Sequence, residues 1–371
     1  MKSILLISPE QWTAHAVSKH HYASALANLG HRVFFLDPPD PSLSKWVLSP
    51  HPSLPNLTLV RGPKLAPYMR FHPVPLRRWL EARWLRHLEK ESRCSIDTIW
   101  LFENSRFFDL SFAGSRLKIY HQVDLNQNFH PETAAATADV CFCTTDFIRE
   151  QLIPHTRRVY KIHHGAPVLA ARQPLSAAQA KNFQADTPNA VYVGNLDIPY
   201  LDARLLAEAV RVNPSVRFHF VGGFSENSSL LQLTRDLSNL VWWNQVPSAL
   251  IPSILEKADV VLCTYRAEQH RAQLASPHKF MEYLASGKVI VSTYTDEYKD
   301  KRHLLEMVDH VTDYLPTLAR VLGDLAHYNS PARIAERKTF AQEHTYEKQV
   351  SRIFDLIHEH STKTVPDESR P

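Results

Sequence analysis

The sequence predicts an α/β protein built from two doubly wound, Rossmann-like domains with a cleft between them. Short apolar runs alternate with helix-like segments along nearly all of its 371 residues. The apolar runs are continuous, which is typical of parallel strands buried on both faces. The alternation is interrupted once, by a polar stretch at residues 168–189, and then restarts. A chain of this length suits two domains of ordinary size.

The first half contains six strand-like runs and is predicted to form an amino-terminal domain, residues 1–167. The segment 16–30 between the first two runs has helical periodicity and ends at Gly30, and glycine commonly follows the last turn of a helix. The predicted strands are residues 3–8, 31–37, 58–61, 97–102, 117–122 and 139–144.

After the polar stretch 168–189, which we interpret as a linker, a second domain is predicted over residues 190–345. The amphipathic segment 346–360 is expected to pack back on the first domain, and the polar residues 361–371 to form a tail. The predicted strands of the second domain are residues 190–195, 216–223, 240–245, 259–265 and 288–293.

Composition narrows the class of protein. A hydrophobic fraction of 44% and a charged fraction of 22% are those of a soluble globular protein. The sequence lacks an apolar run of the ~18 residues that a membrane span needs, and its opening "MKSILLIS" reads as a strand, so we expect a cytoplasmic protein. The net charge of +4 gives no indication of nucleic-acid binding. The histidines and cysteines lack metal-ligand spacing, so no metal site is expected.

The stretch "SPHKFMEYLASGKVIVST", residues 276–293, predicts a helix that is preceded by a serine cap and ends at a glycine. His278 and Lys279 stand in its first turn, where the helix dipole disfavours bases. An anion bound at this helix start would explain them, with Glu282 one turn later accepting from sugar hydroxyls. The alternative is a capped helix with an intrahelical Lys–Glu pair.

The same stretch resembles the segment "sPxKlfEYLAaGkPVVst" of GT-B glycosyltransferases, which lies in the domain that holds the nucleotide-sugar. The likeness continues upstream through residues 246–266 and 191–202. Near the amino end, "QWTAHAVSKHHYASALANLGHRVFFLDPP" is similar to a bacterial group of these enzymes that includes the xanthan-type glucuronosyltransferases. Further counterparts follow in the same order at residues 118–126, 138–152 and 163–167.

This resemblance implies a donor site in the second domain. Glu282 matches the family glutamate that binds the nucleotide ribose, and the helix start faces the donor diphosphate. Gly194 matches a glycine that lets the backbone approach the donor, and the loop around Val246 matches the segment that contacts the nucleobase. The implied donor-binding residues are Gly194, Val246, Tyr265, Arg266, Ser276, His278, Lys279 and Glu282.

The resemblance also implies a catalytic residue, because Asp124 matches the general base of the inverting members. Retaining members carry a glutamate eight residues before the position of Glu282, where this chain has Leu274. An inverting reaction is therefore expected. The sequence has no D-x-D, so we expect Lys279 and Arg266, and not a metal, to neutralise the diphosphate. The alternative for Asp124 is an aspartate that caps the following loop.

Three residues are candidates for the acceptor side. Trp12 and His15 lie in the first loop, and His164 lies near the end of the first domain. For each of them a purely structural role, as a packed tryptophan, a surface histidine or part of a turn, remains open. The first loop also lacks the glycine pair common in the wider family, so the acceptor of familiar members does not carry over.

The segment 73–93 predicts a basic helix with two tryptophans, a combination that suits an anionic membrane surface. The alternative is that its Trp/Leu face is ordinary core and its arginines are solvated. The residues concerned are Arg77, Arg78, Trp79, Leu80, Arg83, Trp84, Leu85, Arg86, Leu88 and Lys90.

The expected function is transfer of a sugar, of hexosyl or glucuronosyl type, from a nucleotide-sugar to a saccharide or lipid-linked acceptor. We expect the donor to be a UDP-sugar and the reaction to serve cell-surface or exopolysaccharide synthesis. The protein is expected to act at the inner face of the plasma membrane, without a cofactor or a metal. Two alternatives stay open: a non-catalytic subunit that binds sugar nucleotides, and a nucleotide-sugar 2-epimerase. A dehydrogenase is disfavoured because G-x-G-x-x-G is missing.

Overall fold

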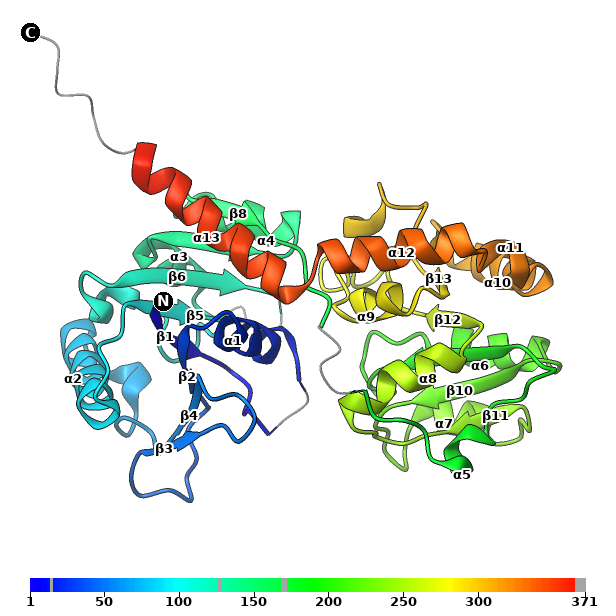
Figure 1. Ribbon diagram of the computed structural model, residues 1–371, viewed down its shortest axis with the longest axis horizontal. Coiled ribbons are helices and arrows are strands. Elements are labelled where there is room, and N and C mark those ends of the chain that lie inside the picture. Colours follow the sequence, from blue (N-terminus) through cyan, green and yellow to red (C-terminus); the bar gives the residue numbers. More distant parts are fainter. Residues whose placement is uncertain (14–15, 126–128, 168–171, 364–371) are drawn as a thin grey trace, which may run out of the picture. The chain divides into compact units, whose positions relative to one another are not determined.

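The computed structural model describes residues 1–13, 16–125, 129–167 and 172–363 (Figure 1). The chain divides into two compact units. The first consists of Met1–Gly165 together with Tyr346–Pro371, and the second consists of Ala166–Thr345. Each unit has one twisted sheet with helices on both faces.

Eight strands in the described part of the first unit form its sheet, in the order β3-β4-β2-β1-β5-β6-β7-β8. Among them β3 alone is antiparallel, to its neighbour β4. The strands are β1 (Ser3–Ile7), β2 (Arg32–Leu36), β3 (Val47–Pro50), β4 (Leu57–Arg61), β5 (Thr98–Leu101), β6 (Leu117–Gln122), β7 (Val140–Cys143) and β8 (Val159–Lys161).

Helices cover both faces of this sheet. The elements are α1 (Ser18–Asn28), η1 (Met69–Phe71), α2 (Val74–Ser92), η2 (Leu110–Ala113), α3 (Pro131–Thr137), α4 (Asp146–Leu152) and α13 (Tyr346–Lys363). On one face Leu26 of α1 and Val350 of α13 share a core, and on the other Trp84 of α2 and Ile148 of α4 belong to a second core. Figure 1 shows α13, the last helix of the chain, lying along the first sheet.

The sheet of the second unit has six parallel strands among the residues described, in the order β11-β10-β9-β12-β13-β14. In order along the chain this is 3-2-1-4-5-6, the arrangement of nucleotide-binding Rossmann folds. The strands are β9 (Asn189–Val193), β10 (Arg217–Val221), β11 (Leu240–Trp242), β12 (Val260–Cys263), β13 (Val289–Ser292) and β14 (Glu306–Met307).

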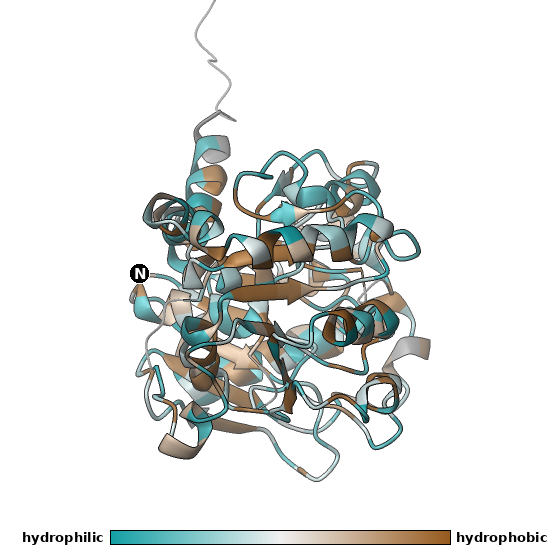
Figure 2. Ribbon diagram, turned by 90° about the vertical axis from the view of Figure 1, so that its right-hand side faces the viewer, coloured by the Kyte–Doolittle hydropathy of each residue, from teal (hydrophilic) through white to brown (hydrophobic). Residues whose placement is uncertain are grey.

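The second sheet is also covered on both faces, with α6 and α10 on one side and α8, α9 and α12 on the other. Its strands are the hydrophobic centre of the unit, and polar residues lie mostly in the surrounding loops and helix surfaces (Figure 2). The elements are α5 (Ala177–Ala180), α6 (Ala203–Val212), α7 (Ser229–Thr234), η3 (Ser248–Leu250), α8 (Ile251–Lys257), α9 (Lys279–Ser286), η4 (Asp296–Tyr298), η5 (Val311–Asp313), α10 (Tyr314–Gly323), α11 (Leu325–Tyr328) and α12 (Pro331–Glu343).

The predicted α/β class with parallel sheets is confirmed, and each predicted strand overlaps an observed one. Three observed strands, β3, β8 and β14, were not predicted. They have two to four residues and lie at sheet edges, so pairing with a neighbouring strand defines them more than their own apolar pattern does.

The stretch interpreted as a linker differs from that expectation where the structure describes it, at residues 172–189. These residues belong to the second unit. The amide of Gln173 donates to the carbonyl of Ala249 at 2.9 Å, and the Phe183 ring stacks on His219 at 4.2 Å. Apolar side chains within a polar stretch therefore anchor it to the second sheet. Residues 364–371 of the expected tail lie outside the described residues.

Candidate functional site

The strand order of the second unit reverses between β9 and β12, and such folds bind ligands beyond the carboxyl ends of the strands at this point. Gly194 follows β9 with φ +147° and Gly222 follows β10 with φ +151°. A Cβ atom on Gly222 would lie 1.9 Å from the carbonyl oxygen of Gly194. Only glycine fits at position 222, because a side chain there would prevent the close contact between the ends of β9 and β10.

We therefore expect Gly222→Ala to destabilise the protein by roughly 2–4 kcal/mol, because the β9 and β10 ends must move apart and alanine is strained at this φ. Gly223→Ala is the matched control, since its nearest neighbour would be 3.8 Å away. Chemical denaturation of both variants measures the difference. Equal stability of the two variants would contradict this account of the strand ends.

Lys279 is the first residue of α9, and its side chain reaches the same place. Its Nζ donates to the carbonyl of Val193 at 3.0 Å and lies 4.2 Å and 4.7 Å from the ring centres of Tyr192 and Tyr265. The Tyr283 hydroxyl, one turn further along α9, also donates to the Val193 carbonyl, at 3.0 Å. The helix start is therefore fixed against the end of β9.

The charge of Lys279 is buried and lacks an ion-pair partner within the part of the chain described. The side chain is buried, and no described carboxylate lies within 4.0 Å of its Nζ. Burial lowers the pKa of Lys279 to about 8, although Cys263 and Glu282 act in the opposite direction. A buried cation without an ion-pair partner within 4.0 Å is costly, and an anion bound at this position would offset that cost.

Glu282 lies one turn into α9 and is half-buried. Burial raises its pKa to about 7, and the charge of Lys279 offsets part of that rise. Strongly shifted groups of opposite sign, side by side at a strand edge, are typical of functional sites. Together the two residues can offer a cation to an anion and a carboxylate to hydroxyl groups.

The start of α9 differs in detail from the prediction. His278, which is exposed, holds the cap position without a side-chain cap, and Ser276 lies two residues earlier. The expectation of a serine cap was therefore wrong. The chain enters the helix through a tight turn in which the Phe280 amide bonds to the Pro277 carbonyl, and this turn moves the first helical residue to Lys279.

Two other predicted donor residues line a pocket of about 120 Å³ beyond β12 and β13. Arg266 is exposed there, whereas Tyr265 is buried and its amide donates to the Thr293 hydroxyl at 2.9 Å. Val246, after β11, is half-buried and packs against the core beside α8. Leu274 is buried in that same core, which is a site for an apolar side chain.

In the first unit, Asp124 follows β6 at the carboxyl edge of the sheet. Its Oδ2 lies 3.6 Å from the Nζ of Lys19, which also donates to Glu10 Oε1 at 3.2 Å. Lys19 comes from the first turn of α1, and Glu10 from the loop after β1. Two carboxylates and one lysine are thus gathered where the strand order of this sheet also reverses, between β1 and β5.

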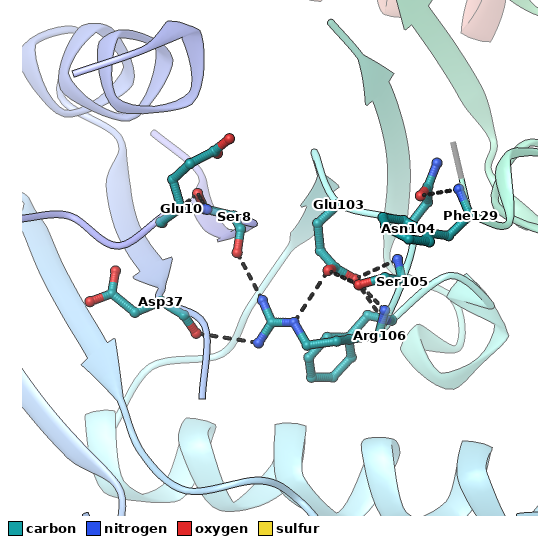
Figure 3. A network of polar contacts seen from close by, with 9 residues as sticks. Ser8, Glu10, Asp37, Glu103, Asn104, Ser105, Arg106 and Phe129 are labelled. Carbon is teal, nitrogen blue, oxygen red and sulfur yellow. Dashed lines mark hydrogen bonds and ion pairs between the residues drawn. The ribbon is translucent and has the colours of Figure 1, made fainter. Parts of the chain in front are cut away.

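A second cluster supports this edge (Figure 3). The Arg106 guanidinium donates to Glu103 Oε2 at 3.2 Å and to the backbone carbonyl of Ser8 at 2.8 Å. It also reaches the Asp37 carbonyl, at 3.4 Å. The carboxylates of Glu10 and Asp37 point away from Arg106, so the arginine ties loop backbones together and leaves those side chains to other contacts.

The acceptor-side candidates occupy different settings. The ring of Trp12 packs 5.0 Å from Phe35 and 5.3 Å from His20, beside the core under α1. His164 is buried, and its Nδ1 lies 3.0 Å from the Ser18 hydroxyl. His15 lies outside the described residues. The Trp12 ring is thus largely surrounded by packed side chains of the first unit, as expected for a structural tryptophan.

Helix α2 divides the side chains of the predicted basic segment between core and surface. Trp84, Leu85 and Leu88 are buried in the first core, and Arg77 is buried against Asp109. Trp79 is 50% exposed, and Arg83, Arg86 and Lys90 are exposed as well. The neighbouring Tyr68 and Phe71 are 77% and 70% exposed.

The described residues contain neither a membrane-spanning helix nor a metal-binding cluster. No helix there has the length and apolarity needed to cross a bilayer. No three or more histidine, cysteine, aspartate or glutamate side chains in the described ranges are placed to hold a metal ion.

Sequence reasoning missed several residues of these sites. A Gly-Gly pair at the end of a predicted strand was the available signal for Gly222. Lys19 stands in a helix first turn, the same anomaly that drew attention to Lys279. Tyr192 and Tyr283 gave no signal, because their contacts to Lys279 and Val193 join distant parts of the chain.

Comparison with known proteins identifies the fold. Residues 187–324, within the second unit, match the family model described as "Glycosyl transferases group 1". No curated protein sequence matches the chain. Sucrose-phosphate synthase from Thermosynechococcus elongatus has a TM-score of 0.73 at 15% identity, with 98% of this chain and 100% of that one covered.

Two further solved structures are similar over nearly the whole chain. An E. coli structure described as trehalose-6-phosphate bound with UDP-2-fluoro glucose gives a TM-score of 0.65 at 16% identity, covering 96% of this chain and 99% of that one. WaaG, a glycosyltransferase involved in lipopolysaccharide biosynthesis, gives 0.61 at 13%, covering 95% and 99%. At these identities the likeness establishes the fold, which is that of GT-B glycosyltransferases.

Proposed function

We propose that this protein is a glycosyltransferase that moves a sugar from a nucleotide-sugar, a UDP-sugar, to an acceptor hydroxyl. The observation that carries the proposal is Lys279, a buried cation without a described counter-charge at the switch point of a Rossmann-type sheet. The diphosphate of a nucleotide-sugar would supply that counter-charge. The similar E. coli structure holds UDP-2-fluoro glucose, and the matched family model, over residues 187–324, lies within this unit.

The donor site follows from the residues around Lys279. The glycine contact at the ends of β9 and β10 opens the backbone to the diphosphate, and α9 directs its free N–H groups toward the same edge. Glu282 would accept from the ribose hydroxyls, and Arg266 from the pocket beyond β12 would add charge. Val246 and its loop would contact the nucleobase.

We assign Asp124 as the general base, which takes the proton of the acceptor hydroxyl as that oxygen attacks the anomeric carbon. The electron pair of the broken carbon–oxygen bond stays with the diphosphate. Leu274 supports an inverting reaction, because a buried leucine stands where retaining relatives carry a glutamate. Proton NMR of the product tests whether the reaction is inverting. We expect the opposite anomeric configuration to that of the donor, and retention of configuration would contradict the inverting mechanism.

The reaction should not depend on a divalent metal, because Lys279, the start of α9 and Arg266 supply the positive charge that stabilises the leaving diphosphate. Transfer in the presence of EDTA should equal transfer without it. Loss of donor binding on adding EDTA, restored by Mg²⁺ or Mn²⁺, would contradict this part of the proposal.

Donor binding should depend on pH in a bell-shaped manner. Lys279, with a pKa of about 8, loses its charge as the pH rises above that value, and Glu282, with a pKa of about 7, becomes a carboxylate as the pH rises through 7. The affinity for UDP should therefore be highest between pH 7 and 8 and fall by up to about tenfold per pH unit above 8. Calorimetric titration from pH 6 to 9.5 measures the profile. A flat profile would contradict the assignment of these two groups.

The acceptor class is proposed from the sequence resemblance and from the surface of α2. Resemblance to the xanthan-type group supports transfer of a hexose or glucuronic acid in the synthesis of a cell-surface or exported polysaccharide. We propose that the exposed Trp79 ring, with the Arg83 guanidinium 5.4 Å from its centre, docks on an anionic membrane surface together with the exposed Tyr68, Phe71 and Arg86. A saccharide carried on a lipid would then be the natural acceptor.

Replacing Arg83 and Arg86 by glutamate should weaken binding to vesicles that contain phosphatidylglycerol by about 2 kcal/mol or more, since each basic residue near such a surface contributes about 1 kcal/mol. The control variant, Arg235→Glu with Lys299→Glu, changes the same charge on exposed residues of the second unit. Co-sedimentation measures both. Equal binding of the two variants would remove α2 as the docking surface.

A further inference from the structure

We propose that Lys19 is the positioning residue of Asp124: it keeps the aspartate carboxylate ionised and oriented toward the acceptor hydroxyl. This inference rests on the proposed function. The Lys19 side chain is 3% exposed, and its Nζ lies 3.2 Å from Glu10 Oε1 and 3.6 Å from Asp124 Oδ2. The Asp124 side chain is 35% exposed, so the lysine holds it from the protein side while part of the side chain faces solvent.

Burying the charge of Lys19 at this position is energetically unfavourable unless the carboxylates of Glu10 and Asp124 offset the cost. A lysine removed from water loses its hydration, and in the first turn of α1 its charge also opposes the helix dipole. No acidic residue of α1 itself stands in that turn. The compensation comes from Glu10 after β1 and Asp124 after β6, so one ammonium group fixes three separate segments at the edge of the sheet.

Among the described residues, burial disfavours the charged forms of the histidine next to Lys19 on α1 and of the tyrosine and histidine on β6. His121, on β6, is completely buried, and burial lowers its pKa to about 3. Burial also lowers the pKa of His20, beside Lys19, below its usual 6.5. Burial raises the pKa of Tyr120 well above its usual 10, so this phenol is neutral too.

A base that abstracts a proton must be ionised before the reaction and correctly placed, and Lys19 would serve both needs. Without it, Glu10 and Asp124 would lose the ammonium group that contacts both of them, and repulsion between carboxylates favours protonation of one. The carboxylate would also lose a contact that limits its orientation. Misplacement of a catalytic group by about 1 Å can cost on the order of 100-fold in rate.

Lys19→Met tests the inference. We expect kcat to fall about 10- to 100-fold, the Kd of UDP to stay within about twofold, and the acidic limb of the kcat–pH profile to move to higher pH. The matched control is Lys118→Met, which removes a lysine paired with Asp139 at 3.1 Å at the amino end of the same strand, β6. That variant should keep the wild-type kcat and profile.

Lys19→Arg keeps a cation at this position and should leave the acidic limb in place even if kcat falls. Wild-type kcat in Lys19→Met, a lower kcat without movement of the limb, or the same movement in Lys19→Arg would each overturn the inference. Asp124→Asn, measured in parallel, separates this failure from that of the proposed function. If that variant still transfers sugar, Asp124 is not the base; if it is inactive while Lys19→Met is normal, only the role of Lys19 falls.

Discussion

Asp124→Asn should lower the transfer rate by at least about 100-fold, because an amide cannot take the proton of the acceptor hydroxyl. Asparagine has nearly the same shape as aspartate, so the fold of the first unit should persist. Binding of UDP should be unchanged, since the donor residues all belong to the second unit. Steady-state kinetics with a saturating donor, together with calorimetric titration of UDP, measure the two effects separately.

A control for this prediction is Asp139→Asn, at the opposite end of the first sheet. Asp139 pairs with Lys118 and accepts from the Lys118 amide at 2.8 Å, so the substitution affects a structural ion pair. It should leave the transfer rate near that of the wild type. Near wild-type transfer by Asp124→Asn would show that a different group is the base, and weaker UDP binding would point to an indirect change of structure.

Lys279→Met should weaken UDP binding by about 10- to 100-fold, because a charged hydrogen bond to the diphosphate contributes about 1.5–3 kcal/mol. The free protein should be at least as stable as the wild type. Methionine removes a buried charge, and the Val193 carbonyl keeps its hydrogen bond from the Tyr283 hydroxyl. Lost binding together with preserved thermal stability distinguishes a site residue from a structural one.

The matched control is Lys288→Met, which changes a half-buried lysine just beyond the other end of α9. It should bind UDP like the wild type. The Lys279→Met variant should also lose the decline of UDP affinity above pH 8, since that decline reports the titration of Lys279. Unchanged UDP affinity in Lys279→Met would remove the donor site proposed here.

Much of the fold could be predicted from the sequence because parallel strands buried on both faces leave continuous apolar runs, such as residues 259–265 for β12 and 288–293 for β13. Short edge strands such as β14 could not be predicted, since only pairing with a neighbour defines them. The polar stretch before β9 was interpreted as a linker because its anchors, such as Phe183, are isolated apolar residues whose partners lie far along the chain.

The candidate site was only partly predictable, for a related reason. Lys279 and Glu282 stood out as charged residues at a helix start. That Lys279 is buried against the Val193 carbonyl, without a described carboxylate, depends on a contact between residues 86 positions apart. Likewise Asp124 could be placed after its strand, but its lysine partner comes from α1 and not from nearby in the sequence.

The most direct test of the account is the release of nucleotide from a panel of nucleotide-sugars, with saccharide and lipid-linked acceptors and with EDTA present. We predict release from a UDP-sugar by the wild type, unaffected by EDTA, and its near-complete loss in Lys279→Met and Asp124→Asn. Binding of UDP without release from any donor, whatever the acceptor, would contradict the account and identify a sugar-nucleotide-binding protein without transferase activity.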